Sequence, residues 1–515
     1  MSSVSIDKAI ITNDEALRAK YGAAGVAQIA TAITALIAAD TARGLRSQLF
    51  HIDDATEMAA VGGSPVIAPA DEQGAKNAID AICNALTPDY LLLLDGPDVV
   101  PHIALDPIPG LADSDRSVPS DLPYACSAPF SRDAADFVGV DRVVGRLPAA
   151  EGADEPALLV SFIQNAIGHR PKPKSQYTKY FGMSADVWSI STQLSLTAAF
   201  GSKTGLQLSP PAAHPGINGL LGQPSHFVNC HGSNMDPRFY GQKGIKFPVA
   251  MESRPIASRA SGGDTVVTAE CCFGAQLYNH RLSGIDEPIC IAYLRSGAIA
   301  FLGSTNIAYG PASASGQADL ICQYFWAGIL VGASAGRALL QARQNFVRTQ
   351  IMSDPTNLKT LAQFLLLGDP SVCPVETPPS KGLDVNALPE NADAAGVGQR
   401  KQRRAALASA GRSLGKAASL PGRPVKDGDR QAVERLRDLA SSKGYGTPVV
   451  LSVTGGAEFR RSIKALRQRR RIVVAVDKDA RPTTDEPTPP LPFTRVFVGH
   501  IVDGTITSVS ECESR

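Results

Sequence analysis

The chain has 515 residues, and at roughly 100–200 residues per domain this length predicts two to four folded units. Hydrophobic residues make up 44% of the sequence and charged residues 19%, which is typical of a globular protein. The formal net charge of +1 argues against a general polyanion-binding role, so we do not expect a nucleic acid partner.

The charge is unevenly distributed along the chain. Residues 391–515 hold 23 lysines and arginines against 13 aspartates and glutamates, a net charge of +10. The remaining residues hold 27 against 36, a net charge of −9. Such an asymmetry indicates that a basic module follows an acidic body.

The first residues, MSSVSIDKAIITNDEALRAKYG, do not pair a basic segment with an apolar one, so we expect no secretory signal. No run of 18 or more apolar residues is present, so we expect no membrane-spanning helix and no membrane partner. The nine cysteines are scattered and include no CxxC pair. They predict reduced thiols, a cytoplasmic location, no metal site and no cofactor.

Predicted strands and helices alternate through the first 375 residues. Strands are expected at 9–12, 48–52, 90–94 and 143–148, with helices at 14–40, 72–86 and 153–167. Further strands are expected at 180–183, 225–230, 264–269 and 297–302, with helices at 190–200, 285–295 and 316–348. This alternation predicts a mostly parallel sheet covered by helices on both faces.

The pattern changes after residue 375. Residues 376–427 lose periodicity and predict a linker. From 428 we expect helices at 429–442 and 457–470, strands at 449–453 and 472–476, and a Pro-rich loop at 482–492. A final hairpin, 494–510, should turn at Asp503-Gly504.

Two strand ends carry candidate chemistry. His231 and Gly232 follow the strand at 225–230, and Cys271 and Cys272 follow the strand at 264–269. If these strands are parallel neighbours, the histidine and a cysteine meet at one edge of the sheet. Imidazole can then activate the thiol for nucleophilic attack, and the amides of Gly232 and Cys271 can form an oxyanion hole. Each residue alone also has a structural explanation, as a loop histidine or as a small buried hydrophobe.

Six landmarks in order resemble the gingipain branch of the caspase/gingipain cysteine peptidases. They are Tyr90–Gly96 with Val99–Pro101, Ser120-Asp121 with Tyr124, Val144–Pro148, the His231/Cys271 pair, Gly297–Thr305 and Leu366–Ser371. The resemblance implies an N-terminal α/β subdomain at 1–180 and a catalytic caspase-like subdomain at 181–375. The linker at 376–427 and a small basic α+β module at 428–515 would follow.

The resemblance also implies a cysteine endopeptidase acting on protein or peptide substrates. It implies that Asp186 orients His231, although an aspartate there can equally cap the following helix. Tyr309 matches an aromatic residue of the substrate pocket, and it can equally be structural. Gly274 lies three residues after Cys271, which favours Cys271 as the nucleophile and leaves Cys272 as the alternative.

Two features depart from the family pattern. No acidic residue stands where arginine-specific members carry one, because Trp188–Ser191 fills that region, so arginine specificity does not transfer. The known members are largely secreted, and this chain shows no such signal. Two other functions stay open: an inactive fold that binds partners, or a transpeptidase that uses the same dyad. The basic module is expected to restrain the acidic body or to dock a protein partner.

Overall fold

The structure is a computed structural model and describes residues 6–258, 263–376, 416–419, 427–454, 470–478, 480 and 489–515. Its helices are α1 (Asp14–Ala42), α2 (Ala55–Ala60), α3 (Glu72–Leu86), α4 (Pro156–Gly168), α5 (Lys174–Tyr177), α6 (Ser189–Phe200), α7 (Ser253–Ala257), α8 (His280–Ser283), α9 (Ile289–Arg295), α10 (Gln317–Leu330), α11 (Ala335–Thr349), α12 (Pro355–Gln363) and α14 (Asp427–Ser442).

A ten-stranded sheet runs through the body in the order β2-β1-β3-β6-β15-β13-β12-β9-β7-β8. Its strands are β1 (Lys8–Thr12), β2 (Ser47–His51), β3 (Tyr90–Leu94), β6 (Val143–Leu147), β7 (Tyr180–Ala185), β8 (Leu206–Ser209), β9 (Ser225–Asn229), β12 (Thr265–Ala269), β13 (Ala298–Ser304) and β15 (Phe364–Leu367). Two short antiparallel pairs stand apart from it, β4 (Ile103–Leu105) with β5 (Val118–Ser120) and β10 (Arg238–Tyr240) with β11 (Val249–Glu252).

The large sheet consists of two parallel halves that run in opposite directions. Every neighbouring pair is parallel except β13 and β15, which pair antiparallel with Phe301 opposite Leu367. The predicted α/β fold with a mostly parallel sheet is therefore confirmed, while the strand β15 was not predicted. One sheet joins both halves, so the boundary proposed between residues 180 and 181 stays a prediction.

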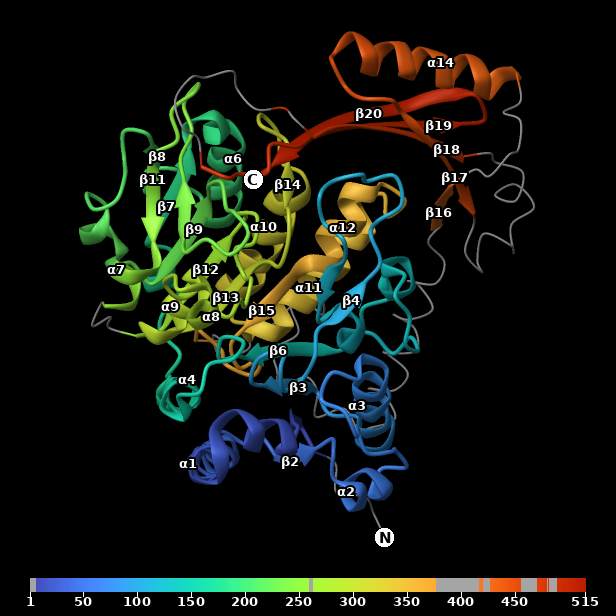
Figure 1. Cartoon of the computed structure of the whole chain (residues 1–515). Helices are drawn as coiled ribbons and strands as arrows, with labels where there is room; N and C mark the ends of the chain where they lie inside the picture. Colours follow the sequence, from blue (N-terminus) through green and yellow to red (C-terminus); the bar gives the residue numbers. More distant parts are fainter. Residues whose placement is uncertain are drawn as a thin grey trace, which may run out of the picture.

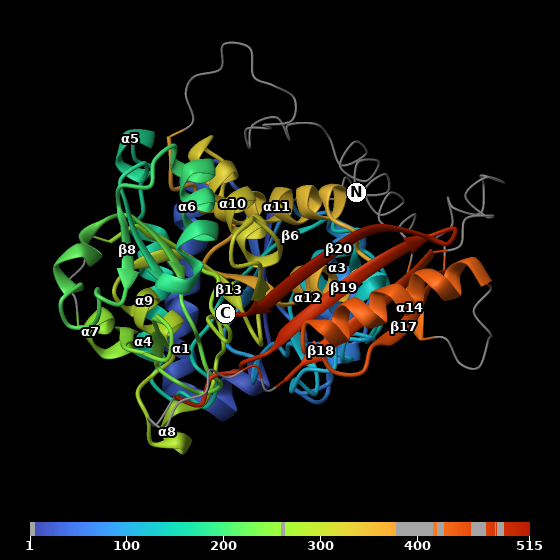
Figure 2. The same cartoon turned by 90° about the horizontal axis from the view of Figure 1, so that it is seen from above.

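Helices cover both faces of this sheet. The helices α6, α10 and α11 lie along one face and α1, α4 and α9 along the other (Figure 2). All five residues of Tyr90–Leu94 are buried, because a strand covered on both faces is apolar throughout rather than alternating.

The helix α1 is long and apolar enough to cross a membrane by length and composition. Its most apolar 18-residue window has a mean hydropathy of 1.7 and is 28% buried, which differs from our expectation that no segment would qualify. In this fold α1 connects the parallel strands β1 and β2 and packs against α4. A helix that covers a sheet also needs an apolar face, so the composition of α1 is explained by its place in the fold. The cytoplasmic location stays a prediction.

The C-terminal part forms an antiparallel sheet in the order β14-β20-β19-β18-β17-β16. Its strands are β14 (Tyr309–Gly310), β16 (Lys416–Ser419), β17 (Val449–Thr454), β18 (Arg470–Asp477), β19 (Arg495–Val502) and β20 (Thr505–Ser514). The hairpin turns at Asp503 and Gly504, whose φ angles are 48° and 82°, as predicted. Residues 457–469 of the expected helix, residues 482–488 of the expected Pro-rich loop and most of the linker lie outside the described residues.

The strand β14 belongs to the body and forms one edge of the C-terminal sheet. The strand β20 of the module therefore pairs directly with the body. Figure 1 shows β20 leaving the layer beneath α14 and ending beside β14 and α6. Tyr309 pairs with Ser514, and Gly310 with Glu513. The end of the described chain therefore reaches the sheet edge at which β9, β12 and β13 end.

Candidate active site

The strands β9 and β12 are parallel neighbours, with Val228 opposite Ala269. His231 therefore follows one strand end and the two cysteines follow the adjacent one, as the sequence predicted. His231, Cys271 and Cys272 are all buried. The sheet edge brings an imidazole and two thiols into one region, and their surroundings distinguish the two thiols.

The side chain of Cys271 lies in the core. Its Sγ atom lies 3.9 Å from the carbonyl oxygen of Val228, and its main-chain oxygen accepts a hydrogen bond from the Ser304 hydroxyl. Burial and, secondarily, the nearby Cys230 thiol raise the pKa of Cys271 well above its usual range. A thiol that packs against the neighbouring strand in the core has the surroundings of a structural cysteine.

The side chain of Cys272 faces a different segment. Its Sγ atom accepts a hydrogen bond from the Ala308 amide at 3.3 Å, and burial raises its pKa to about 12. The chain turns at the next residue, Phe273, whose φ of 56° is in the left-handed region. A bulky residue seldom adopts this conformation, and such backbone strain is concentrated at functional sites.

Two amides converge on the main-chain oxygen of Arg515, the last residue of the printed sequence. The Cys272 amide donates to this oxygen at 3.1 Å and the Gly232 amide at 3.4 Å. A β-carbon on residue 232 would lie 1.8 Å from the Cys272 carbonyl oxygen, so only glycine fits there. This pair is an oxyanion hole in geometry. Its second donor is the Cys272 amide, whereas the sequence suggested the Cys271 amide.

His231 has one partnered and one unpartnered ring nitrogen. Its Nε2 atom lies 2.6 Å from Gln242 Oε1, and the amide group of Gln242 is oriented by donation to the Gly244 carbonyl oxygen. Since that Oε1 atom can only accept, Nε2 carries the proton. The buried Nδ1 atom has no hydrogen-bond partner among the described residues, and its lone pair is free to accept a proton.

The electrostatic surroundings keep His231 neutral. Burial is the largest cause that lowers its pKa to about 4, and the positive charge of Arg515 lowers it further. The imidazole ring packs against Trp188, with ring centroids 4.3 Å apart. With Arg515 in place, the imidazole and the Cys272 thiol are therefore both uncharged at neutral pH.

Asp186 does not contact His231. Its carboxylate forms an ion pair with Lys243 at 3.4 Å, while Gln242, the residue before that lysine, occupies the position beside the imidazole. The expected acidic partner is therefore replaced by an amide in this arrangement. Gln242 lies in the loop after β10, and nothing in the sequence distinguished it.

The guanidinium group of Arg515 is completely buried in a pocket with an acidic wall. Its Nη2 atom lies 3.3 Å from both carboxylate oxygens of Asp319 and donates to the Pro311 carbonyl oxygen at 2.9 Å. Trp188 covers the guanidinium, with its ring centroid 4.6 Å from Cζ. A β-carbon on Gly310 would lie 2.3 Å from Nη2. We call the site formed by Trp188, Gly310, Pro311 and Asp319 the arginine pocket.

A second carboxyl group lies beside the arginine pocket. Glu270 is completely buried, and burial together with the charge of Asp319 raises its pKa well above the usual range. Burial raises the pKa of Asp319 as well, and the positive charge of Arg515 opposes that rise. Together the two carboxyl groups favour a cationic side chain, because a buried carboxylate requires a partner of opposite charge.

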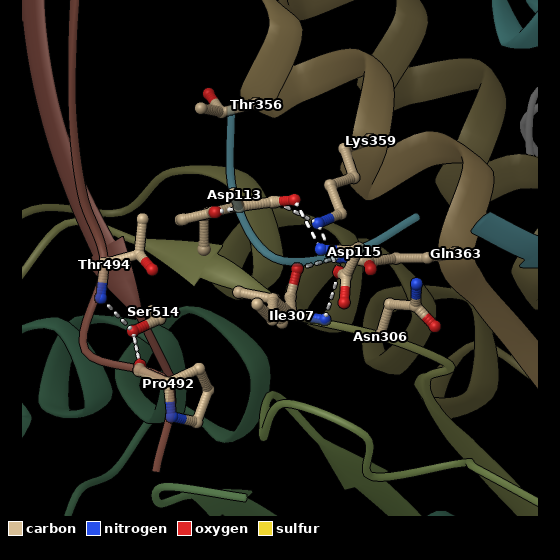
Figure 3. Close-up of polar contacts among 12 residues, drawn as sticks. Asp113, Asp115, Asn306, Ile307, Thr356, Lys359, Gln363, Pro492, Thr494 and Ser514 are labelled. Carbon is tan, nitrogen blue, oxygen red and sulfur yellow. Dashed lines mark hydrogen bonds and ion pairs between the residues drawn. The ribbon is translucent and has the colours of Figure 1, made fainter. Parts of the chain in front are cut away.

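The Tyr309 side chain contacts a cluster of buried charged residues next to the arginine pocket. Its hydroxyl donates to Asp113 at 2.9 Å, and Asp113 also accepts from Lys359. Lys359 lies 2.6 Å from Asp115, which accepts the Ile307 amide at 3.0 Å (Figure 3). Trp188, not Tyr309, lies against the guanidinium of Arg515, and the substrate contact expected of Tyr309 stays a prediction. The buried charges fix segment 307–310, to which β20 pairs.

Several residues of this site could not be recognised in the sequence. In the sequence Trp188 is only a departure from the family pattern, and no motif distinguishes Asp319 or Gly310. No group of three or more His, Cys, Asp or Glu side chains is arranged to hold a metal within the described ranges. A cavity of about 560 Å³ lies beside the site and is lined in part by Met235, Gln276 and Asn306.

Comparisons with known proteins agree with the expected family. Residues 256–374 match Peptidase family C25. The chain is similar to the crystal structure of the Arg-specific cysteine proteinase gingipain R, with a TM-score of 0.51, 9% identity, and 99% of this chain and 98% of that chain covered. A second structure, described as a protease, has a TM-score of 0.46 and 13% identity, with 99% of this chain and 97% of that chain covered. The Saccharomyces cerevisiae separase–securin complex has a TM-score of 0.30 and 13% identity, with 45% of this chain and 14% of that chain covered. No curated protein sequence matches the chain.

Proposed function

We propose, from the premise that this chain belongs to peptidase family C25, that it is a cysteine endopeptidase cleaving the bond after an arginine. One observation carries the proposal: the Arg515 main-chain oxygen lies between the Gly232 and Cys272 amides while its guanidinium fills the arginine pocket. A residue held in this way occupies the position of the residue that precedes a scissile bond.

The contacts support Cys272 as the nucleophile. Its own amide donates to the bound main-chain oxygen, which brings its side chain near the adjoining carbonyl carbon. Cys271 Sγ lies instead against Val228 in the core. The sequence favours Cys271 because of the spacing to Gly274, and the cysteine that a covalent probe labels distinguishes the two thiols.

The chemistry follows from the two groups at the strand ends. His231 Nδ1 accepts the thiol proton as Cys272 Sγ attacks the carbonyl carbon, and the two amides stabilise the negative oxygen that forms. The imidazolium then gives this proton to the leaving amine, and an acyl-enzyme remains. Water, activated by the same nitrogen, attacks the thioester and releases the carboxylic acid and the free thiol.

The arginine pocket supports the specificity. The carboxylate of Asp319 is buried, so an uncharged side chain in the pocket would leave it without a partner, which is costly in a low-dielectric site. The absence of a side chain on Gly310 leaves room for the guanidinium. The acidic residue comes from α10 rather than from the 186–191 region, where the family pattern led us to look.

A covalent probe tests the proposal. A peptide ending in an arginine chloromethyl ketone should alkylate Cys272, identified by mass spectrometry, and a norleucine analogue of the same length should react far more slowly. Both probes should be applied to the wild-type chain and to Arg515→Ala, which leaves the pocket to the probe. Hydrolysis of an arginyl coumarin amide should be lost after probe labelling.

The other outcomes of this probe experiment favour the alternative nucleophile or one of the alternative functions. Labelling at Cys271 would reject the assignment of the nucleophile. The absence of both labelling and hydrolysis would support an inactive fold that binds partners. If an added amine is joined to the arginyl product faster than water hydrolyses it, the reaction is transpeptidation with the same dyad.

A further inference from the structure

The last three residues of the described chain lie along the body as a peptide substrate would. We call residues 513–515 the tail. The Arg515 amide donates to the Ala308 carbonyl oxygen at 3.0 Å, and Ser514 and Glu513 continue the antiparallel pairing with Tyr309 and Gly310. Extended peptides are commonly recognised by such addition of a strand to a sheet edge.

Side-chain contacts give the tail a defined register. Glu513 accepts a hydrogen bond from the indole nitrogen of Trp188, and Arg515 occupies the arginine pocket. The Ser514 hydroxyl donates to the Pro492 carbonyl oxygen and accepts from the Thr494 amide (Figure 3). The middle residue thus holds the tail to its own module, while the residues on each side of it contact the catalytic body.

From these contacts, and on the basis of the proposed peptidase function, we propose that the tail is a tethered competitive inhibitor that closes the substrate groove from within the same chain. The occupied groove is specific for an extended peptide with arginine before the scissile bond and a carboxylate two residues earlier. Peptide substrates bind only when the tail leaves.

The C-terminal module holds the tail close to the groove. Five aliphatic side chains on one face of its sheet belong to the same buried cluster as the body: Leu451, Ile472, Val474, Val496 and Val498. The other face packs on α14 through residues such as Leu436 and Phe497. Because the module docks through an apolar face, the tail stays near the groove, and a short tether gives an effective concentration in the millimolar range.

The body and the module also meet at a partly charged contact. His500 Nε2 lies 3.5 Å from Asp354 Oδ2, and a β-carbon on Gly110 would lie 2.8 Å from Leu451 Cδ1. Among the described residues the restraint is therefore mainly apolar, with the fully buried ion pair of Arg515 and Asp319 and the His500–Asp354 contact in addition. Salt should weaken it only slightly, because buried pairs are little screened, whereas the overall charge asymmetry had suggested a long-range electrostatic contact.

Occupation by the tail also explains the state of the thiol. With Arg515 in place, Cys272 and His231 are both buried, the pKa of the thiol is raised and that of the imidazole is lowered. A thiol in this state is a poor nucleophile. Departure of the tail would admit water and remove one positive charge beside the imidazole, which favours proton transfer between the two groups.

The test compares full-length variants that release the tail in different ways. Arg515→Ala removes the guanidinium, and Ser514→Pro removes the amide that donates to the Thr494 carbonyl oxygen at 2.8 Å while keeping Arg515. Arg430→Ala is the matched control, because Arg430 is exposed on α14 and pairs only with Glu434 among the described residues. The two measurements are hydrolysis of an arginyl coumarin peptide and the rate of Cys272 alkylation by iodoacetamide.

We expect both tail variants to raise kcat/KM and the alkylation rate on the order of tenfold or more, and the control to match the wild type. The gain should not depend on protein concentration, since the inhibition is intramolecular. Unchanged rates of both kinds in both variants would overturn tail inhibition even if hydrolysis is robust. Faster alkylation without hydrolysis in any variant would instead uphold the tail and reject the peptidase function.

Discussion

The Cys272 amide donates to the main-chain oxygen of Arg515 at 3.1 Å, and this contact links the catalytic body to the end of the C-terminal module. Cys272 follows a central strand of the body, whereas Arg515 follows the last strand of the C-terminal module. The contact supports Cys272 as the cysteine at the proposed oxyanion hole, and it brings the end of the module to a position that its basic composition did not predict. The four predictions below separate these roles.

The two adjacent cysteines should respond differently to substitution. Cys272→Ala should lower kcat/KM by about 10⁴-fold or more, because a covalent nucleophile is lost. Cys271→Ala should keep activity within a few fold and lower the free energy of unfolding by about 1–2 kcal/mol, as expected for a small buried side chain. Kinetics and urea unfolding of both variants provide the check, and an inactive, stable Cys271→Ala would reverse the assignment.

Gln242 should act as a positioning residue for His231. Gln242→Glu introduces a carboxylate beside Nε2, and an opposite charge raises the pKa of an imidazole. The acid limb of the kcat/KM profile should therefore move to higher pH. Asp186→Asn should leave the profile unchanged, because Asp186 contacts Lys243. If Asp186→Asn moves the acid limb and Gln242→Glu does not, Asp186 orients the base as the family resemblance implied.

The arginine pocket should discriminate by charge and by size. In the Arg515→Ala background, where the tail no longer competes for the pocket, Asp319→Asn should lower kcat/KM for an arginyl substrate by roughly 30-fold or more, since truncating a buried charge pair costs about 2–5 kcal/mol. Gly310→Ala should have the same selective effect by filling the space of the guanidinium. Matched substrates with alanine in place of arginine serve as the reference. Equal losses on both substrates would show that these residues do not set specificity.

Much of the fold was predictable because local patterns determined it. The continuous apolar run Tyr90–Leu94 and the amphipathic helix Glu72–Leu86 have the predicted bounds. The strands β9 and β12 are parallel neighbours as expected, so His231 and the two cysteines follow adjacent strand ends. These features depend on short-range periodicity and on the rule that parallel strands place their carboxyl ends together.

The remainder of the site depends on contacts between distant segments. Trp188, Asp319 and Arg515 meet only because α6, α10 and β20 converge, and no local pattern encodes that meeting. The choice between Cys271 and Cys272 depends on the direction of each side chain at a turn. That turn uses a left-handed Phe273, a conformation that the sequence did not indicate.

The final prediction concerns pH. With the tail in place the pKa of His231 is about 4, below its ordinary value near 6.5, chiefly because of burial and then because of Arg515. A site without the tail is more hydrated and lacks that charge, so its imidazole binds a proton at higher pH. By linkage, the tail-bound state is fully favoured above about pH 6.5 and loses stability as the pH falls toward 4.

Hydrogen exchange measures this release directly. After correction for intrinsic rates, the amides of Arg515 and Cys272 should exchange faster at pH 5 than at pH 7, because acid opens the contact between them. Protonation of Asp319 would act in the same direction by weakening its ion pair with Arg515. His231→Gln removes the titrating imidazole and should flatten most of the dependence. An equally steep dependence in this variant would assign the pH response to Asp319 and Glu270 instead of His231.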